Sequence, residues 1–255
     1  MKILLAITLC LFVSGSLVAQ QEKKLVIGEQ PVYKVHKARG SITVDGVRNE
    51  PAWANAEIRS LDYFYRADRA PDKQKTLFRM LWDEGYIYLF YDCEDTSLTA
   101  RETIPDSRPY LDDCAEFFCL PVPDSLNLHF GFEINLYKAA FDYVMIMNFY
   151  NGRYAFIKSY NPAYKAEVAY QGTINDNSDK DKGWQMEIAI PFSAFNDLNS
   201  FFPAKVGTRW AFQAVRQDRN IISESRRSTS TLFPIYDIRK DVHQPSRFGL
   251  MEFVE

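Results

Sequence analysis

The sequence predicts an all-β protein, a single antiparallel β-sandwich with jelly-roll-like connections that follows an N-terminal signal peptide. Residues 183–192 alternate strictly between apolar and other side chains and end at a proline. Similar short segments recur along the chain with no long helical segment between them. One apolar and one polar face per strand is typical of antiparallel sheets, and ten or so short strands are typical of a sandwich.

The expected strands follow one another at short intervals. They are 41–44, 75–82, 86–93, 114–120, 129–136, 140–147, 165–174, 184–190, 209–216 and 248–253. Residues 49–54 predict a single helical turn, capped by Asn49 with a proline in its first turn. The polar residues 175–182 connect two strands. Apolar alternation places Trp53, Trp184 and Trp210 in the core, whereas Trp82, at a hairpin tip, fits either the core or a ligand site.

The first residues are typical of a secretion signal. Lys2 precedes a short apolar run, and small residues lead to an expected cleavage site after Ala19. The run is shorter than the roughly 20 apolar residues that span a bilayer, and no later segment predicts a membrane span. We therefore expect a signal peptide at 1–19, an N-terminal extension at 20–40 and one domain at 41–255, exported to the periplasm or the cell exterior.

The composition argues against two classes of partner. Thirty Lys and Arg against 33 Asp and Glu give a net charge of −3 without a basic stripe, so nucleic acid is not expected. Cys93, Cys114 and Cys119 remain after the signal, and with only three histidines their spacing does not predict a zinc site. We interpret them as small core residues and leave one disulfide open, because an exported compartment permits it.

An ordered set of short motifs resembles a known family. The motifs are 42–46 with 50–53, 81–88 with 92–95, 112–118, 184–192, 207–210 with Arg216, and 243–249. Together they resemble the family 9 carbohydrate-binding modules, in the wider group of sandwich domains that includes the DOMON domains. The resemblance covers residues 42–253. It implies sugar binding, often beside glycoside hydrolases such as xylanases that act on plant polysaccharides, and structural calcium.

A sugar site needs flat aromatic walls for the faces of the ring and polar groups for its hydroxyls. The resemblance implies that Tyr110 is such a wall and that Glu116 accepts hydrogen bonds from the sugar. Two other interpretations stay open. Glu116 also fits a solvated or calcium-organising carboxylate, and Tyr110 also fits a loop tyrosine that covers the sheet edge.

The resemblance also implies a second aromatic wall, often tryptophan, in a loop before the closing segment. Residues 228–237 offer Phe233 and Tyr236 but no tryptophan, which departs from the family pattern. Arg216 ends a strand at an inward position, where a guanidinium needs carboxylate or carbonyl partners. It is a candidate either for contact with the ligand or for bracing the loops.

Calcium requires several converging oxygen atoms, which Asp-rich turns supply. Asp92, Asp95, Asp112 and Asp113 lie at the ends of expected strands and are the candidate ligands. No organic cofactor is expected.

Several function classes compete. The leading one is a glycan-binding protein without catalysis of its own. A glycoside hydrolase would use a pair among Glu116, Glu133 and Glu187, which we expect to face outward. A haem-binding redox domain would need an axial Met and His, for which Met145, Met147 and His129 are available. An interaction module that has lost its ligand is the fourth.

Overall fold

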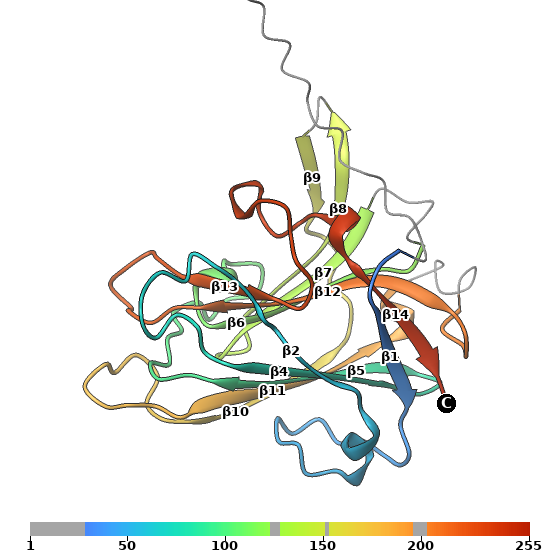
Figure 1. The fold of residues 1–255 in the computed structure, drawn as a ribbon, viewed down its shortest axis with the longest axis horizontal. Coiled ribbons are helices and arrows are strands. Elements are labelled where there is room, and N and C mark those ends of the chain that lie inside the picture. The colour runs from blue at the N-terminus through green and yellow to red at the C-terminus, as the bar shows by residue number, and fades with distance from the viewer. Residues whose placement is uncertain (1–28, 123–127, 151–152, 196–202) are drawn as a thin grey trace, which may run out of the picture.

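The computed structural model describes residues 29–122, 128–150, 153–195 and 203–255. Almost all regular structure in these residues is strand, and the helices are single 3-10 turns (Figure 1). The all-β class is therefore confirmed. The predicted signal peptide lies outside the described residues. In the described ranges, no helix is both long and apolar enough to cross a membrane.

The strands and turns have the following bounds. The strands are β1 Val32–Lys37, β2 Ile58–Ser60, β3 Tyr63–Tyr65, β4 Thr76–Trp82, β5 Tyr86–Glu94, β6 Cys114–Leu120, β7 Leu128–Asn135, β8 Ala140–Tyr150, β9 Arg153–Ile157, β10 Lys165–Gln171, β11 Gly183–Pro191, β12 Arg209–Asp218, β13 Ser228–Thr231 and β14 Gly249–Val254. The 3-10 turns are η1 Pro51–Asn55, η2 Pro109–Leu111, η3 Phe192–Phe195, η4 Ile238–Lys240 and η5 Pro245–Arg247.

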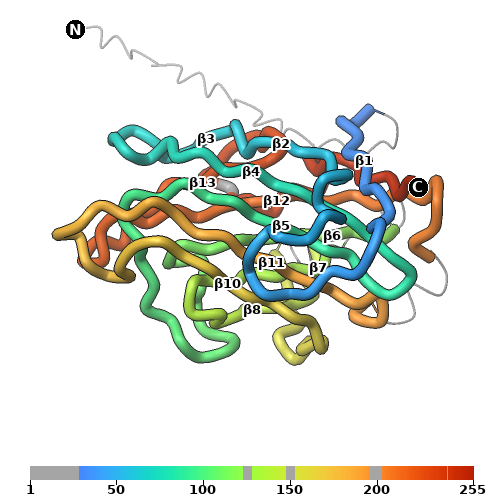
Figure 2. Tube along the Cα trace, turned by 90° about the horizontal axis from the view of Figure 1, so that it is seen from below, coloured from blue at the N-terminus to red at the C-terminus, as the bar shows by residue number. Residues whose placement is uncertain are grey.

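The strands form one continuous hydrogen-bonded path that folds into two layers. Its order is β10-β11-β5-β4-β1-β14-β12-β6-β7-β8-β9, and β13 pairs with β12 and β3. In Figure 1 the strands β4, β5, β10 and β11 form one layer, and β6, β12 and β13 lie in the other. Figure 2 shows the first layer from below, with β10, β11, β5 and β4 side by side.

The N-terminal segment before residue 41 is part of this sheet. β1 lies between β4 and β14 and runs parallel to both, whereas the other pairs are antiparallel. The predicted strand at 41–44 is wrong, because these residues are irregular. Tyr33 and Val35 of β1 point into the core. The alternation of buried side chains that is typical of a strand is therefore present within residues 20–40, which we assigned to an extension.

The core between the layers follows the predicted alternation. On β11 the side chains Trp184, Met186, Ile188 and Ile190 are all buried in it. Trp53, Trp82 and Trp210 are buried as well; Trp82, which fitted two roles, packs its ring against Phe253 and donates from Nε1 to the carbonyl of Val254. Cys93, Cys114 and Cys119 are buried free thiols.

A second apolar cluster lies on the outer face of the layer that contains β6 and β12. Phe118, Tyr143, Val215 and Phe248 belong to it, together with Ile235 from the segment after β13. Because this cluster covers one face and the core covers the other, every side chain of β6 is buried. The polar residues of β6 and β12 therefore lie inside the protein.

Arg216 joins the two layers of the sandwich. From β12 its Nη1 donates to Thr76 Oγ1 and to the carbonyl of Glu94, at 3.0 and 2.8 Å. Its Nη2 donates to Asp95 Oδ2 at 3.0 Å, and its guanidinium lies 5.6 Å from the Trp184 ring centre. These contacts are with strands of the opposite layer or with the residue that follows one, so Arg216 braces the structure.

Replacement of Arg216 by methionine is expected to destabilise the protein by about 3–5 kcal/mol, because Asp95 would remain buried without its cation. Urea unfolding measures this. Arg209→Met is the matched control, since Arg209 pairs with Glu252 while 40 % of its side chain is exposed. Loss of that surface pair is expected to cost less than about 1 kcal/mol. If Arg216→Met and Arg209→Met lost the same free energy of unfolding, the bracing role of Arg216 would be contradicted.

Candidate functional site

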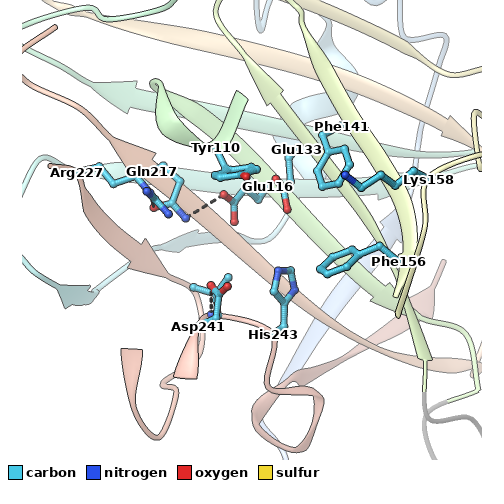
Figure 3. A pocket seen from close by; sticks show the side chains of 11 residues that line it. Tyr110, Glu116, Glu133, Phe141, Phe156, Lys158, Gln217, Arg227, Asp241 and His243 are labelled. Atoms are coloured by element: carbon cyan, nitrogen blue, oxygen red, sulfur yellow. Dashed lines mark hydrogen bonds between the residues drawn. The ribbon is translucent and has the colours of Figure 1, made fainter. Parts of the chain in front are cut away.

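A pocket of about 220 Å³ opens on the outer face of the layer that contains β6 and β12. Its lining residues come from segments far apart in the sequence: Tyr110, Glu116, Glu133, Phe141, Phe156, Lys158, Gln217, Arg227, Asp241, Val242 and His243. Figure 3 shows the two glutamates and Gln217 on one side of the pocket, with Asp241 and His243 facing them.

Strand pairing places the polar groups on the pocket floor. Glu116 on β6 lies directly opposite Glu133 on β7. Gln217 on the other neighbour, β12, donates from Nε2 to Glu116 Oε1 at 2.9 Å. Gln217 is held in turn by Thr229 Oγ1 and Arg227 Nε, which donate to its Oε1 at 2.7 and 3.0 Å. The polar floor is therefore rigid.

Tyr143 and two histidines support the second glutamate. The Tyr143 hydroxyl donates to Glu133 Oε1 at 2.7 Å and lies 3.5 Å from His243 Nε2. Nδ1 of His243 lies 3.1 Å from Nε2 of His129, and both rings are buried. The Tyr143 ring crosses β7 at Gly131, where a Cβ atom would lie 2.3 Å from Cζ of the ring. A side chain at Gly131 would push the tyrosine out of this network.

The glutamates lie in a poorly solvated place. Only 2 % of Glu116 and 3 % of Glu133 is exposed. Burial raises the pKa of Glu116 to about 8, although the hydrogen bond from Gln217 opposes it. Burial and then the charge of Glu116 raise the pKa of Glu133 well above its ordinary value. We expected Glu116, Glu133 and Glu187 to face outward, and all three are buried because a further layer covers each of them.

Aromatic rings form the walls. Tyr110, in η2, is half-buried and lies 6.3 Å from the ring centre of Phe141. Phe156, on β9, is 41 % exposed and packs edge-on against Tyr143. Tyr110, Phe141 and Phe156 thus offer apolar surface around the carboxyl groups.

Two of the five predicted ligand residues line the pocket, and three lie elsewhere. Tyr110 and Glu116 line it. Arg216 points into the opposite layer, and Phe233 is in the central core. Tyr236 is half exposed and stacks with Arg247, 4.4 Å from its guanidinium carbon.

Sequence reasoning had named Glu133 only for a hydrolase, and it missed Gln217, Phe141, Phe156 and the segment 241–243. Gln217 follows Arg216, so alternation alone puts it on the face opposite to the core. No comparable signal was present for Phe156 or Asp241, whose positions depend on long-range packing.

The four predicted calcium ligands do not converge as one set. Asp95 and Asp113 meet Asp218, with carboxylate oxygens all within 4.8 Å. Asp112 instead accepts from the backbone of Arg101 and Glu102, and Asp92 accepts from Gln185. Arg216 already donates to Asp95 and lies 3.5 Å from Asp218, so a guanidinium supplies positive charge where calcium would. This group therefore fits calcium poorly.

A second acidic group suits calcium better. Asp45, Glu50 and Glu187 also have carboxylate oxygens within 4.8 Å of one another. Glu50 Oε2 is buried and has no hydrogen-bond partner. Asp45 is exposed, so water could complete the six to eight oxygen ligands that calcium takes.

One family model matches most of the chain. The model of the carbohydrate family 9 binding domain-like family matches residues 44–255. A search of curated proteins found no match. A crystal structure of a candidate carbohydrate-binding protein from Bacteroides uniformis has a TM-score of 0.66 and 19 % identity, over 88 % of this chain and 99 % of that one.

A second solved protein is a family 9 carbohydrate-binding module from Caldicellulosiruptor kristjanssonii. Its complex with cellotriose has a TM-score of 0.58 and 17 % identity, over 88 % of this chain and 94 % of that one. Its complex with glucose has a TM-score of 0.57 and 17 % identity, over 86 % of this chain and 95 % of that one. At these identities the structures support the fold.

The raised pKa of Glu116 predicts a stability that depends on pH. The folded state keeps the proton up to about pH 8, while the unfolded chain releases it near 4.5, so stability falls as pH rises through this range. Glu116→Gln removes this effect. Between pH 5 and pH 8 we expect the melting temperature of the variant to rise relative to that of the original protein by about 10 °C.

Glu167→Gln, on β10, controls for the loss of one negative charge, because 44 % of the Glu167 side chain is exposed. If the melting temperatures of Glu116→Gln and the original protein differed by the same amount at every pH from 5 to 8, the buried, protonated state of Glu116 would be contradicted.

Proposed function

The chain belongs to the carbohydrate family 9 binding domain-like family, and from that premise we propose that the pocket between Tyr110 and His243 binds a saccharide. The observation that carries the proposal is the juxtaposition of aromatic walls and free carboxyl oxygens in one pocket. Oε2 of Glu116 and Oε2 of Glu133 are buried without hydrogen-bond partners. A ligand with hydroxyl groups satisfies both of them.

The pocket has the two kinds of surface that a pyranose needs. The C–H faces of a sugar pack on flat aromatic rings, which Tyr110, Phe141 and Phe156 supply. Hydroxyl groups on the rim form hydrogen bonds with the glutamates, whose second oxygens have no partner in the protein. The pocket volume suits about one ring, so we propose recognition of the ends of xylan or glucan chains, as part of polysaccharide breakdown.

We propose binding without hydrolysis. A glycosidase needs one carboxyl group that stays protonated and one that stays ionised, and their surroundings must push the two pKa values apart. Here burial raises the pKa of both Glu116 and Glu133. Glu187 holds the indole of Trp53 and the backbone of Asp45 and Gly46 on another face. This supports a binding role.

The geometry gives little support to the haem alternative. Axial ligands approach the iron from opposite sides of the ring. His129 and Met145 are directly opposite residues on β7 and β8, so their side chains start about 5 Å apart on the same face. His129 is also engaged by His243.

We further propose that the protein is exported after cleavage near Ala19 and that a structural calcium ion binds at Asp45, Glu50 and Glu187. Through this ion Glu187 on β11 would be linked to Asp45 and Glu50, which lie in the irregular segment before η1. The calcium ion would neutralise the negative charge of these three carboxylates.

Tyr110→Ala is expected to weaken saccharide binding about tenfold, because one wall of the pocket is lost. Isothermal titration with glucose, cello-oligosaccharides and xylo-oligosaccharides measures this, with dissociation constants expected in the micromolar to millimolar range. Tyr170→Ala is the control, since Tyr170 is 48 % exposed on β10 and does not line this pocket. Equal affinity in all three proteins would contradict the assigned pocket, and release of reducing ends would contradict a non-catalytic role.

Calcium at about a hundredfold excess over its dissociation constant is expected to stabilise the protein by about 2.7 kcal/mol, and a chelator should reverse this. Thermal melting measures the shift. Glu50→Gln should abolish most of it, whereas Glu84→Gln, exposed in a hairpin, should leave it intact. No shift in the original protein would exclude calcium at this group.

A further inference from the structure

The two glutamates on the pocket floor form a pair of neighbouring carboxyl groups. Their strands place them directly opposite each other, and both are at least nine-tenths buried. One oxygen of each is held by the protein: Gln217 donates to Glu116 and Tyr143 donates to Glu133. The second oxygen of each has no partner. Figure 3 shows both carboxyl groups directed into the pocket.

Two cations, Arg227 and Lys158, line the same pocket, and each is directed to an aromatic ring. Arg227 lies over the Tyr110 ring, with its guanidinium carbon 5.7 Å from the ring centre, and its Nε donates to Gln217. Lys158 is exposed and has its Nζ 5.1 Å from the centre of the Phe141 ring. Among the described residues, neither glutamate takes part in an ion pair.

Of the groups around the pair, Arg227 lowers the pKa of both glutamates by its charge, but by less than burial raises it. Asp241 is exposed on the opposite side and is itself acidic. Burial lowers the pKa of His243 and lowers that of His129 further below its ordinary value, so both are neutral near pH 7. Tyr143 is a neutral donor, because burial holds its pKa well above its usual range. The two free carboxyl oxygens are therefore left without an ion-pair partner.

Burial raises the pKa of both carboxyl groups, and the charge of Glu116 raises that of Glu133 further, so both keep their protons. When a neutral sugar binds, the carboxyl groups keep these protons and use them in hydrogen bonds to its hydroxyl groups. When a protonated amine binds, its three N–H groups can donate to the carboxyl oxygens and its positive charge allows a carboxyl group to release its proton to the solvent. Its ring would still pack on Tyr110, Phe141 and Phe156.

We propose that the pocket selects a pyranose that carries a protonated amine, of the glucosamine type, over the corresponding neutral sugar. This inference rests on the proposed saccharide-binding function and narrows it from neutral glucan or xylan ends to an amine-bearing ring. An N-acetylated ring lacks the charge, and a uronic acid carries the opposite one, so both should bind less well than the amine.

The test compares three monosaccharides that differ at one carbon: glucose, glucosamine and N-acetylglucosamine. Isothermal titration at about pH 6, where a sugar amine is protonated, should give about tenfold tighter binding of glucosamine than of glucose, as expected for a charge-assisted hydrogen bond. Titration in buffers of different ionisation enthalpy should show proton release with glucosamine and less with glucose. At about pH 9.5 the amine is neutral and the preference should disappear.

Glu133→Gln keeps the shape of the side chain and removes its ability to ionise beside the amine, so the ratio of glucosamine to glucose affinity should fall about fivefold or more. Glu167→Gln should keep the original ratio, because 44 % of that side chain is exposed and it does not line the pocket. Circular dichroism and melting establish that each variant is folded. The comparison of sugars on the original protein stands even if Glu133→Gln does not fold.

The outcomes separate this inference from the function it rests on. Tighter binding of glucosamine at about pH 6, lost at high pH, supports it. Equal or tighter binding of glucose would overturn it while leaving saccharide binding intact. No binding of any of the three sugars, nor of longer glucan and xylan oligosaccharides, would overturn both.

Discussion

Arg216 and Gln217, which are neighbours on β12, point to opposite faces of the sheet, and both the contact between the layers and the pocket depend on this. Arg216 points through the core to Asp95 and to the opposite layer, and Gln217 points the other way to Glu116. Because successive side chains of a strand lie on opposite faces, one strand both ties the sandwich together and builds the floor of the pocket. A slip of one residue would put a guanidinium in the pocket and an amide in the core.

Burial on both faces gives the pocket its chemistry. The outer face of a sandwich sheet is normally solvated, and a carboxylate there behaves as it does in water. Here the segment after β13 covers β6 and β12, and with Phe248 it forms a second apolar cluster. Glu116 and Glu133 consequently lie in a region where charge is costly, which raises their pKa values and favours a ligand that brings donors.

The aromatic walls of the pocket differ from those that the family resemblance implies. The resemblance places the second aromatic wall between residues 228 and 237. Phe233 lies against the backbone of Gly249, where any Cβ atom would collide with its ring, and Tyr236 stacks on Arg247 near the surface. Phe141 and Phe156 take the wall positions instead, from β8 and β9. A different set of strands thus supplies the aromatic surface.

Tyr110 and Glu116 were candidates through the family resemblance alone. The sandwich class, the positions of most strands and the core role of Trp184 could be predicted from the sequence pattern itself. These follow from local rules, since a period of two and the turn residues are readable over a few positions. The strand β1 was missed, because it lies in a stretch that we read as an extension. Only the tertiary structure decided that Glu133 stands beside Glu116, that 241–243 closes the pocket and that Arg216 is a brace. Those facts depend on strand order, which pairs Glu116 with Glu133, and on packing that joins Arg216 to Asp95 over more than 100 positions, and local alternation carries no information about either.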